Sequence, residues 1–329
     1  MGDTLWGTPA IRAIKKKLPE ASIDLLLQKQ WMPLFHGNKN LRNLIPYHPQ
    51  WYRQLVPLLT LLKYRYSHVL IFHANKDIRR IIPCLRTSSI WSHQYPDTIK
   101  GIQSKNIIRI DKPAHGILRR LMMVEKIQIP SDGTHMDIVL SKDEKNEAKF
   151  FLETHGTRSK EFIYLNIGGS VPYKQWPVDQ FITLANLILN NTSLKIILGG
   201  GPEDTHRINF INSQINQEGV IAASNRSLIE NCALIKNAKV LVTPDSGPMH
   251  IGFSLKTPTI SLFWGTDSKG LIRNKLNGEN YCGPLNIDET LSSVLCGNFF
   301  NTSKGVDSDS STSKLILASD VWKKMLKFL

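Results

Sequence analysis

The sequence has no long hydrophobic run. Its longest apolar stretches, such as Leu55-Val-Pro-Leu-Leu-Thr-Leu-Leu62, fall well short of the roughly 20 residues that a membrane-spanning helix needs. No secretory signal opens the chain. Met1-Gly2 also fails as a myristoylation site, because Trp6 stands where that motif requires Ser or Thr. These absences argue against a membrane span and a lipid anchor, so we expect a cytoplasmic protein.

Cysteine is scarce and scattered. The four cysteines, Cys84, Cys232, Cys282 and Cys296, include no Cys-x-x-Cys pair. Disulfide frameworks and structural zinc sites both depend on recognisable cysteine spacings, so we expect neither of them here. The cysteines are predicted to be reduced thiols, and no metal site is expected.

Negative charge is in short supply. The chain has 41 Lys and Arg against 27 Asp and Glu, which gives a formal net charge of +14. The excess is uneven: residues 1–155 hold 24 basic against 13 acidic residues, and residues 156–329 hold 17 against 14. Such a surface favours an anionic partner. No nucleic-acid motif accompanies the charge, so a phosphate-rich lipid or glycolipid is the favoured partner. The alternative, a basic surface that only serves solubility, stays open.

Short apolar runs alternate with amphipathic stretches along the whole chain, which has 329 residues and is long enough for two domains. In the first half we expect helices at 8–18, 51–66 and 116–126, strands at 22–27 and 67–72, and further elements at 79–85 and 107–110. In the second half we expect strands at 162–167, 194–198, 220–223, 240–242 and within 256–267, and helices at 141–155, 178–189, 205–215, 227–236 and 248–255. The alternation predicts an α/β fold whose parallel sheets are covered by helices.

We expect two domains and a final helix. The first domain spans residues 1–155, the second spans 156–313, and an amphipathic helix covers 314–329. Pro130–Asp137 is the expected approach to the linker. Asn298–Ser313 is rich in Ser, Asn, Thr and Asp and is predicted to be a flexible surface loop.

The turn after the strand at 240–242 has the chemistry of an anion site. Thr243-Pro-Asp-Ser-Gly247 ends the strand, and the proline that follows suits the first turn of a helix. The amides of Ser246 and Gly247 then point outward, with the positive end of the helix dipole behind them. Asp245 and His250 flank these amides. In the alternative interpretation this is only a capped helix, with Asp245 as N-cap and His250 packed in the interior.

Two further motifs stand at predicted turns. Tyr164-Leu-Asn-Ile-Gly-Gly-Ser-Val-Pro-Tyr-Lys-Gln-Trp-Pro177 places Ser170 and Lys174 just after a strand, where a hydroxyl and an ammonium can hold phosphate oxygens. Gly2-Asp-Thr-Leu-Trp-Gly-Thr-Pro-Ala-Ile-Arg-Ala-Ile14 places Asp3 ahead of a helix. The local alternatives are that Lys174 is an exposed turn lysine and that Asp3 is an N-cap.

These three motifs, in their order along the chain, resemble those of glycosyltransferase family 9, the ADP-heptose:lipopolysaccharide heptosyltransferases. The shared patterns are a Gly-Asp turn before a Thr-Pro helix, a Lys-x-Trp-Pro turn and an Asp-Ser-Gly-x-x-His turn. The resemblance runs nearly end to end. It implies the GT-B architecture, in which two Rossmann-like domains face each other across a cleft and the C-terminal helix packs back toward the first domain.

The resemblance also implies a reaction. Heptose would pass from ADP-heptose to a lipid A inner-core acceptor at the inner membrane, with inversion, without metal and without any other cofactor. Asp3 is the expected general base. Ser170 and Lys174 would contact the donor diphosphate, and Glu203 or Asp204 would accept hydrogen bonds from the ribose. The other expected donor-site residues are Asp245, Ser246, Gly247 and His250.

One feature departs from the family pattern. Family members have an apolar strand ahead of the Gly-Asp turn, whereas only Met1 precedes Gly2 here. Because the first strand of a doubly wound sheet is normally central, we expect a first sheet that lacks this strand and has open edges.

Two rival functions stay open. One is another GT-B enzyme, which uses a different nucleotide sugar or epimerises one. The other is a non-catalytic homologue that binds a sugar or glycolipid. Gly199-Gly-Gly-Pro202 does not indicate a dinucleotide enzyme, because it lacks the G-x-G-x-x-G spacing at a first strand.

Overall fold

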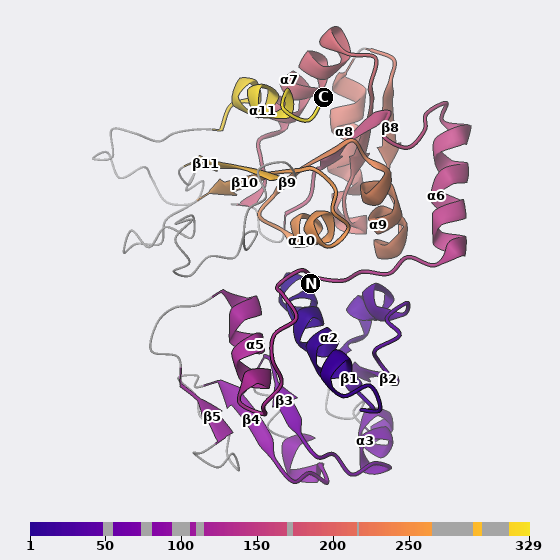
Figure 1. Cartoon of the computed structure of the whole chain (residues 1–329). Coiled ribbons are helices and arrows are strands. Elements are labelled where there is room, and N and C mark those ends of the chain that lie inside the picture. Colours follow the sequence, from indigo (N-terminus) through magenta and orange to yellow (C-terminus); the bar gives the residue numbers. More distant parts are fainter. Residues whose placement is uncertain are drawn as a thin grey trace, which may run out of the picture. The chain divides into compact units, whose positions relative to one another are not determined.

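The chain folds into two α/β units, shown in the computed structural model of Figure 1. The structure describes residues 1–48, 55–73, 81–93, 106–109, 115–169, 174–215, 217–264, 292–297 and 316–329. Within these ranges the first unit ends at Val139 and the second begins at Leu140. Every strand pairing in them is parallel, so the predicted fold class is confirmed.

The first unit begins with the short helix α1 (Gly2–Leu5) and helix α2 (Thr8–Lys17). Its other helices are α3 (Leu55–Leu62) and α5 (Gly116–Glu125), with 3-10 turns η1 (Lys29–Phe35) and η3 (Ile82–Cys84). Its strands are β1 (Asp24–Gln28), β2 (Asn43–Tyr47), β3 (Val69–Ile71), β4 (Ile90–His93) and β5 (Ile107–Ile108).

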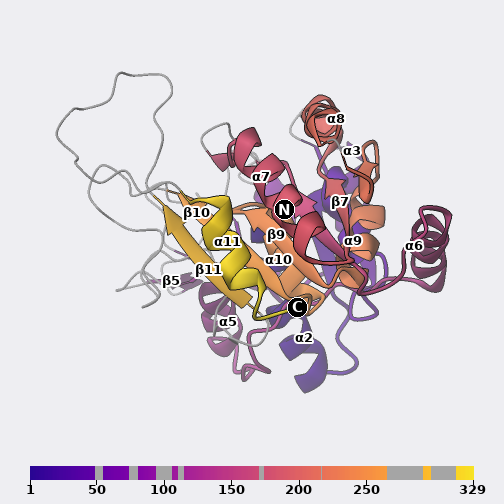
Figure 2. The same ribbon diagram turned by 90° about the horizontal axis from the view of Figure 1, so that it is seen from above.

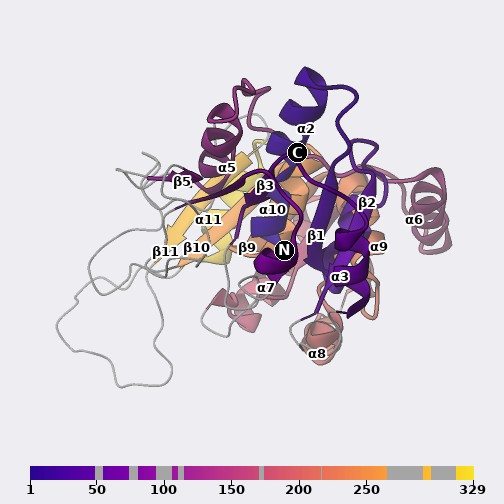
Figure 3. The same ribbon diagram turned by 90° about the horizontal axis from the view of Figure 1, so that it is seen from below.

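The described strands of the first unit form two separate sheets. β1 pairs with β2, and β3, β4 and β5 form the other sheet in that order. Figure 3 shows β1 and β2 side by side, with α3 next to them. Among the described strands, β1 and β3 each border a sheet, and the effect of a missing first strand stays a prediction.

Strands β2 and β4 were not expected from the sequence. β2 contains Pro46, which argues against a strand because proline cannot donate to a ladder. In the structure β2 is the outer strand of a two-stranded sheet, where a proline is tolerated. The element expected at 79–85 is the 3-10 turn η3 in the described residues.

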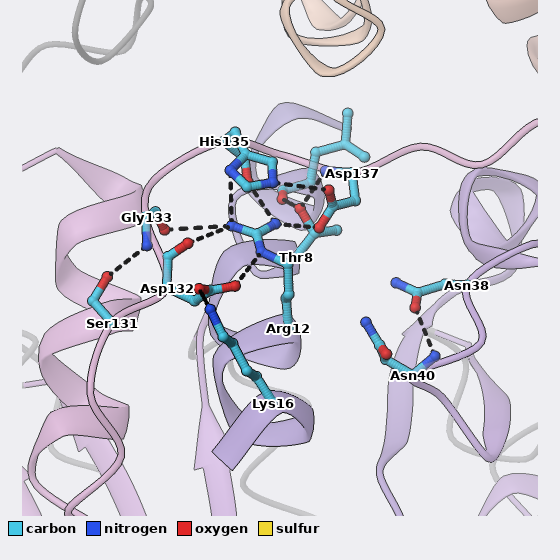
Figure 4. A network of polar contacts seen from close by, with 11 residues as sticks. Thr8, Arg12, Lys16, Asn38, Asn40, Ser131, Asp132, Gly133, His135 and Asp137 are labelled. Atoms are coloured by element: carbon cyan, nitrogen blue, oxygen red, sulfur yellow. Dashed lines mark hydrogen bonds and ion pairs between the residues drawn. The ribbon is translucent and has the colours of Figure 1, made fainter. Parts of the chain in front are cut away.

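The segment before the unit boundary is pinned to α2 (Figure 4). The Arg12 guanidinium donates to the Asp132 and Asp137 carboxylates and, at 2.9 Å, to the carbonyl of His135. The backbone amide of Asp137 donates to the Thr8 hydroxyl at 2.9 Å. Lys16 also binds Asp132, and its ammonium holds the pKa of that carboxyl below the ordinary value. The expected approach to the linker is thus a fixed part of the first unit.

The second unit is built on one doubly wound sheet. Its strands are β6 (Phe162–Asn166), β7 (Lys195–Gly199), β8 (Val220–Ala223), β9 (Val240–Pro244), β10 (Thr259–Trp264) and β11 (Ser292–Gly297). They lie in the order β11-β10-β9-β6-β7-β8. The chain starts at β6, winds outward to β8, and then returns to β9 on the other side of β6. The strand order therefore reverses between β6 and β9, which is where such sheets bind ligands.

Helices cover both faces of this sheet. They are α6 (Lys142–Thr154), α7 (Val178–Asn191), α8 (Thr205–Gln214), α9 (Leu228–Asn237), α10 (Gly247–Ser254) and α11 (Ala318–Met325). Figure 1 shows α7 and α11 on one face and α10 on the other. β6 and β9 are buried along their whole length, as expected for central strands of a parallel sheet.

The unit boundary lies earlier than the predicted division at residue 155. Helix α6 belongs to the second unit, where it packs against α9 and buries Phe151 and Leu152. Its start is fixed by a capping box, in which the Ser141 hydroxyl accepts from the Glu144 amide and the Glu144 carboxylate accepts from the Ser141 amide. The helix was correctly predicted, but the first domain was extended too far.

The C-terminal helix α11 is also part of the second unit. Val321 and Met325 are fully buried in its core, and Figure 2 shows α11 beside α7 and along β10 and β11. The sequence correctly predicted an amphipathic helix here. Its apolar side fills the core of the second unit, and its packing toward the first domain stays a prediction.

Some basic side chains of the second unit close helix ends. The Lys195 ammonium donates to the His155 carbonyl at 2.7 Å, at the end of α6. Lys160 donates to the Ala238 carbonyl at 2.7 Å, after α9, and Lys236 donates to the Leu255 carbonyl at 2.8 Å, after α10. Helix C-termini carry unpaired carbonyls and the negative end of the dipole, so a cation is stabilising there. Burial lowers the pKa of Lys160.

Three further predictions concern the cysteines, a membrane span and the loop near the C-terminus. Cys84 and Cys232, the cysteines whose side chains are described, are free thiols. In the same part of the chain, no helix combines the length and the apolar character that crossing a membrane would need. The loop expected at Asn298–Ser313 lies outside the described residues.

Candidate functional site

The candidate site of the second unit lies where the strand order reverses. The turns after β6 and β9 meet there because these strands are neighbours, with Leu165 opposite Val242 in register. The turn after β7 lies on the other side of β6, where Asn166 is opposite Gly199. Three loops that are distant in sequence therefore share one edge of the sheet.

Asn166, the last residue of β6, joins two of these loops. Its side-chain amide nitrogen lies 3.0 Å from the Gly168 carbonyl, 3.1 Å from the Thr243 hydroxyl and 3.3 Å from the Ser246 hydroxyl. The side chain is almost fully buried. Asn166 was not among the predicted site residues, although a lone polar residue ending a buried apolar strand was a signal that could have identified it.

The turn between β9 and α10 is open to an anion. The N-cap of α10 is Ser246 in extended conformation, and no side chain caps this helix. Within the described ranges, the backbone N–H groups of Ser246 and Gly247 donate no hydrogen bond to another group of the protein. Unpaired amides at a helix N-terminus are suited to bind an anion. The capped-helix interpretation, with Asp245 as N-cap, is wrong.

Asp245 instead forms an ion pair with Lys174. Lys174 Nζ lies 2.7 Å from Asp245 Oδ2, and the two side chains are only 17% and 12% exposed. The alternative that Lys174 is an ordinary exposed turn lysine is therefore wrong. An ammonium has three N–H donors, and this bond uses one of them. The structure thus brings Lys174 next to Asp245, Ser246 and Gly247, and their contact with a donor stays a prediction.

The loop that carries Lys174 is anchored on both sides. Trp176 is fully buried, donates from Nε1 to the Ile316 carbonyl at 2.9 Å, and packs edge-on against Phe181. Arg207 of α8 donates to the Gln175 side chain and to the Trp176 carbonyl. These anchors hold the turn in place beside the ion pair. Nothing in the sequence indicated Arg207, because it lies on a different helix.

Two predicted residues are not placed at an open site. Ser170 lies outside the described residues. His250 is buried in α10 at 5% exposure, with its ring edge-on to Phe253. This position matches the packed alternative, and a contact between His250 and a ligand stays a prediction.

The glycine turn after β7 is shaped by close packing. A Cβ on Gly199 would lie 1.9 Å from the Tyr164 hydroxyl oxygen. That hydroxyl donates to Asn231 Oδ1 at 2.6 Å, and Asn231 in turn donates to the Gly200 carbonyl at 3.1 Å. Glycine at position 199 is therefore required by the neighbouring Tyr164 side chain.

The two acids beside this turn have different surroundings. Glu203 is exposed, whereas Asp204 is 6% exposed. The sequence left both open as acceptors for a ribose. Only the carboxylate of Glu203 is available at the surface to a ligand.

Asp3, the predicted base, lies in the first unit, exposed in the first turn of α1. The following helix α2 has Gly7 as its N-cap and no side-chain cap. The Thr8 hydroxyl turns back to the Leu5 carbonyl at 2.8 Å. The N-cap alternative for Asp3 is therefore wrong, and the carboxylate is accessible from solvent.

Arg120 holds the backbone of Asp3 in place. From α5 it donates to the Asp3 and Gly116 carbonyls, both at 2.8 Å, and its guanidinium lies 5.4 Å from the centre of the Trp6 ring. A Cβ on Gly116 would lie 2.1 Å from that ring. Helix α1 is thereby fixed to α5 by the hydrogen bond from the Arg120 side chain to the Asp3 carbonyl and by close packing. Arg120 was not identified from the sequence.

Comparison with known proteins agrees with this arrangement. A family model for glycosyltransferase family 9 (heptosyltransferase) matches residues 98–279, which is more than half of the chain. Lipopolysaccharide heptosyltransferase 3 of Escherichia coli (strain K12) is 24% identical over 279 residues, or 81% of this chain and 80% of that protein.

Solved structures are similar over almost the whole chain. A family 9 glycosyltransferase from Veillonella parvula superposes with a TM-score of 0.80 at 19% identity, over 99% of this chain and 93% of that one. E. coli heptosyltransferase WaaC, solved with ADP, gives a TM-score of 0.70 at 16% identity, over 99% and 94%. These likenesses establish the GT-B fold. The chain therefore belongs to glycosyltransferase family 9 and is a glycosyltransferase.

Proposed function

We propose that this glycosyltransferase transfers heptose from ADP-heptose to a lipopolysaccharide inner-core acceptor. The observation that carries the proposal is the anion site of the second unit, where the Ser246 and Gly247 amides lie beside the Lys174–Asp245 ion pair. The names of the relatives support the sugar and the acceptor: one is a lipopolysaccharide heptosyltransferase. WaaC was solved with ADP, which supports the nucleotide.

In this proposal the donor diphosphate binds the amides of Ser246 and Gly247 and the ammonium of Lys174. In the free chain Asp245 balances the charge of Lys174, so the pair adds no net charge to the site. The amides and the helix dipole then supply the attraction for the phosphates. Glu203 accepts hydrogen bonds from the ribose, while Ser170 and His250 complete the donor contacts.

The chemistry is a single displacement. The acceptor hydroxyl gives its proton to Asp3, and its oxygen forms a bond to the anomeric carbon of heptose. The bond from that carbon to the diphosphate oxygen breaks on the opposite face, so the configuration inverts and ADP leaves with the electron pair. Lys174 and the helix amides stabilise the charge that develops on ADP, which allows the step to proceed without a metal ion.

We also assign the acceptor to the membrane surface. The first 155 residues carry most of the excess positive charge, 24 basic against 13 acidic residues. Helix α3 exposes Leu59 and Leu62, at 62% and 36%, and the exposed Lys63 and Arg65 follow directly. Apolar side chains next to cations suit the surface of an anionic membrane. The protein would then work at the inner face of the cytoplasmic membrane.

Gly247→Val tests the donor site. The side chain would intrude where the backbone amides approach the diphosphate, so ADP affinity should fall by at least roughly tenfold while folding is retained. Calorimetric titration with ADP measures the affinity, and thermal unfolding measures the fold. Ser254→Val adds the same side chain at the other end of α10 and should bind ADP normally. Unchanged affinity in Gly247→Val would move the donor site elsewhere.

Asp3→Asn tests the base. The amide cannot take the proton, so kcat should fall by roughly 10²–10⁴-fold with donor affinity unchanged. The readout is release of ADP in the presence of donor and acceptor. Asp143→Asn is the matched control, because Asp143 is also the exposed second residue of a helix. Normal turnover by Asp3→Asn would show that the catalytic assignment is wrong.

Reversing charge next to α3 tests the membrane surface. Because each basic residue near an anionic bilayer contributes about 1 kcal/mol, Lys63→Glu with Arg65→Glu should weaken vesicle binding at least tenfold. Co-sedimentation with vesicles that contain phosphatidylglycerol, at low and high salt, measures this. The control Lys142→Glu with Lys145→Glu changes two exposed lysines of α6 in the second unit. Equal, salt-insensitive losses in both variants would contradict the assignment.

A further inference from the structure

The buried acid Asp204 faces the backbone of two glycine loops. Its Oδ2 accepts a hydrogen bond from the Gly201 amide at 2.8 Å, so it closes the turn that follows β7. The same oxygen reaches the loop after β6, where a Cβ on Gly168 would lie only 2.1 Å away. A Cβ on Gly200 would lie 2.7 Å from it. One carboxylate thus occupies the space between the two loops.

The glycines at these positions are required by this approach. Among described glycines, a positive φ is found at Gly133, Gly156 and Gly219, so Gly168 and Gly200 do not have the left-handed backbone that alone would favour glycine. An alanine is therefore compatible with their backbone, and the obstacle is the carboxylate. This makes the contact testable by substitution from either side.

Asp204 is connected to the anion site through Gly168 and Asn166. The Gly168 carbonyl accepts from the side-chain amide of Asn166 at 3.0 Å, and the same amide reaches the Ser246 hydroxyl. On its other side, the turn after β7 is fixed by Asn231, which donates to the Gly200 carbonyl. A displacement of the loop after β6 would therefore be passed to Ser246, whose amide belongs to the anion site.

A charge at this position is unfavourable in itself. Burial raises the pKa of the Asp204 carboxyl, while the hydrogen bond from Gly201 opposes the shift and the Glu203 charge adds to it. A buried carboxylate is costly unless its hydrogen bonds compensate. The residue is thus better suited to hold backbone than to meet solvent or a sugar hydroxyl.

We infer that Asp204 is a positioning residue of the donor site: it sets the separation of the loops after β6 and β7 and does not bind the ribose. The inference rests on the proposed function, since the donor is taken to be an ADP-sugar. It leaves Glu203 as the acid that meets the ribose. It also predicts that Asp204 and Gly168 act on nucleotide affinity through a single contact.

A double-mutant cycle tests this contact in the full chain. Gly168→Ala should weaken ADP binding roughly tenfold, because the new methyl group must displace the loop or the carboxylate. Asp204→Ala should weaken it by a similar factor, since it removes a hydrogen bond to a charged group. With the carboxylate absent, adding Gly168→Ala should cause less than about a twofold further loss. Losses that simply multiply would overturn the inference.

A second ligand separates positioning from ribose binding. For 2′,3′-dideoxy-ADP, which lacks the ribose hydroxyls, Asp204→Ala should lose the same factor in affinity as for ADP. A loss seen only with ADP would make Asp204 a ribose acceptor and overturn the inference. Glu203→Gln should weaken the binding of ADP but not that of 2′,3′-dideoxy-ADP. Glu218→Ala, at an exposed acid just before β8, should bind both nucleotides like the unchanged protein.

The outcome also distinguishes this inference from the proposed function. Failure of the unchanged chain to bind ADP would contradict the donor assignment, and the same cycle in unfolding free energy would still decide whether Asp204 and Gly168 are coupled. If Asp204→Ala does not fold, Asp204→Asn retains an acceptor oxygen at the same place. Asp204→Asn should then bind ADP more tightly than the single variant Gly168→Ala, in which the Asp204 carboxylate is intact. The reverse order would overturn the inference.

Discussion

The parallel pairing of β6 with β9 brings together turns that are 77 residues apart in the chain, from Asn166 to Thr243. Both strands are buried throughout, so their position is fixed by the core of the second unit. The hydrogen bonds of Asn166 then set the two turns against each other. The anion site depends on this junction, which sets the Ser246 turn beside the loop after β6 and brings Lys174 within 2.7 Å of Asp245.

The two units use positive charge differently. In the second unit Lys174 is balanced by Asp245, and Lys160, Lys195 and Lys236 close the ends of helices. Attraction for an anion there comes mainly from oriented amides, which act at short range and discriminate by geometry. In the first unit the exposed cations Lys63 and Arg65, which follow α3, can act over longer distances. This division suits a small charged donor and a large anionic acceptor.

Local signals were sufficient for the α/β class and for most strands and helices of the second unit, but strand β11 was not expected from the sequence. Buried apolar strands that alternate with amphipathic helices left little choice of class, and Trp176 and Gly247 mark turns by their chemistry. Contacts between segments that are distant in the sequence could not be predicted from local patterns. The pairing of Lys174 with Asp245, the grip of Arg207 on the Lys174 loop and the hold of Arg120 on Asp3 each join elements whose order in space is set by the sheets. Strand β2 was not predicted, and it contains Pro46, a residue that is unfavourable in a strand. The amphipathic pattern predicted α11, but such a pattern does not reveal which core its apolar side fills.

The central claim is that the turns at the β6–β9 junction bind the adenosine diphosphate part of a sugar donor. Thermal unfolding of the full chain at increasing concentrations of ADP, UDP and GDP tests it most directly, since a ligand that binds only the folded state raises the unfolding temperature, and does so at lower concentration the tighter it binds. The account predicts that ADP stabilises the protein at lower concentrations than UDP or GDP. Stabilisation by UDP or GDP in preference to ADP, or no stabilisation by any of the three, would contradict it.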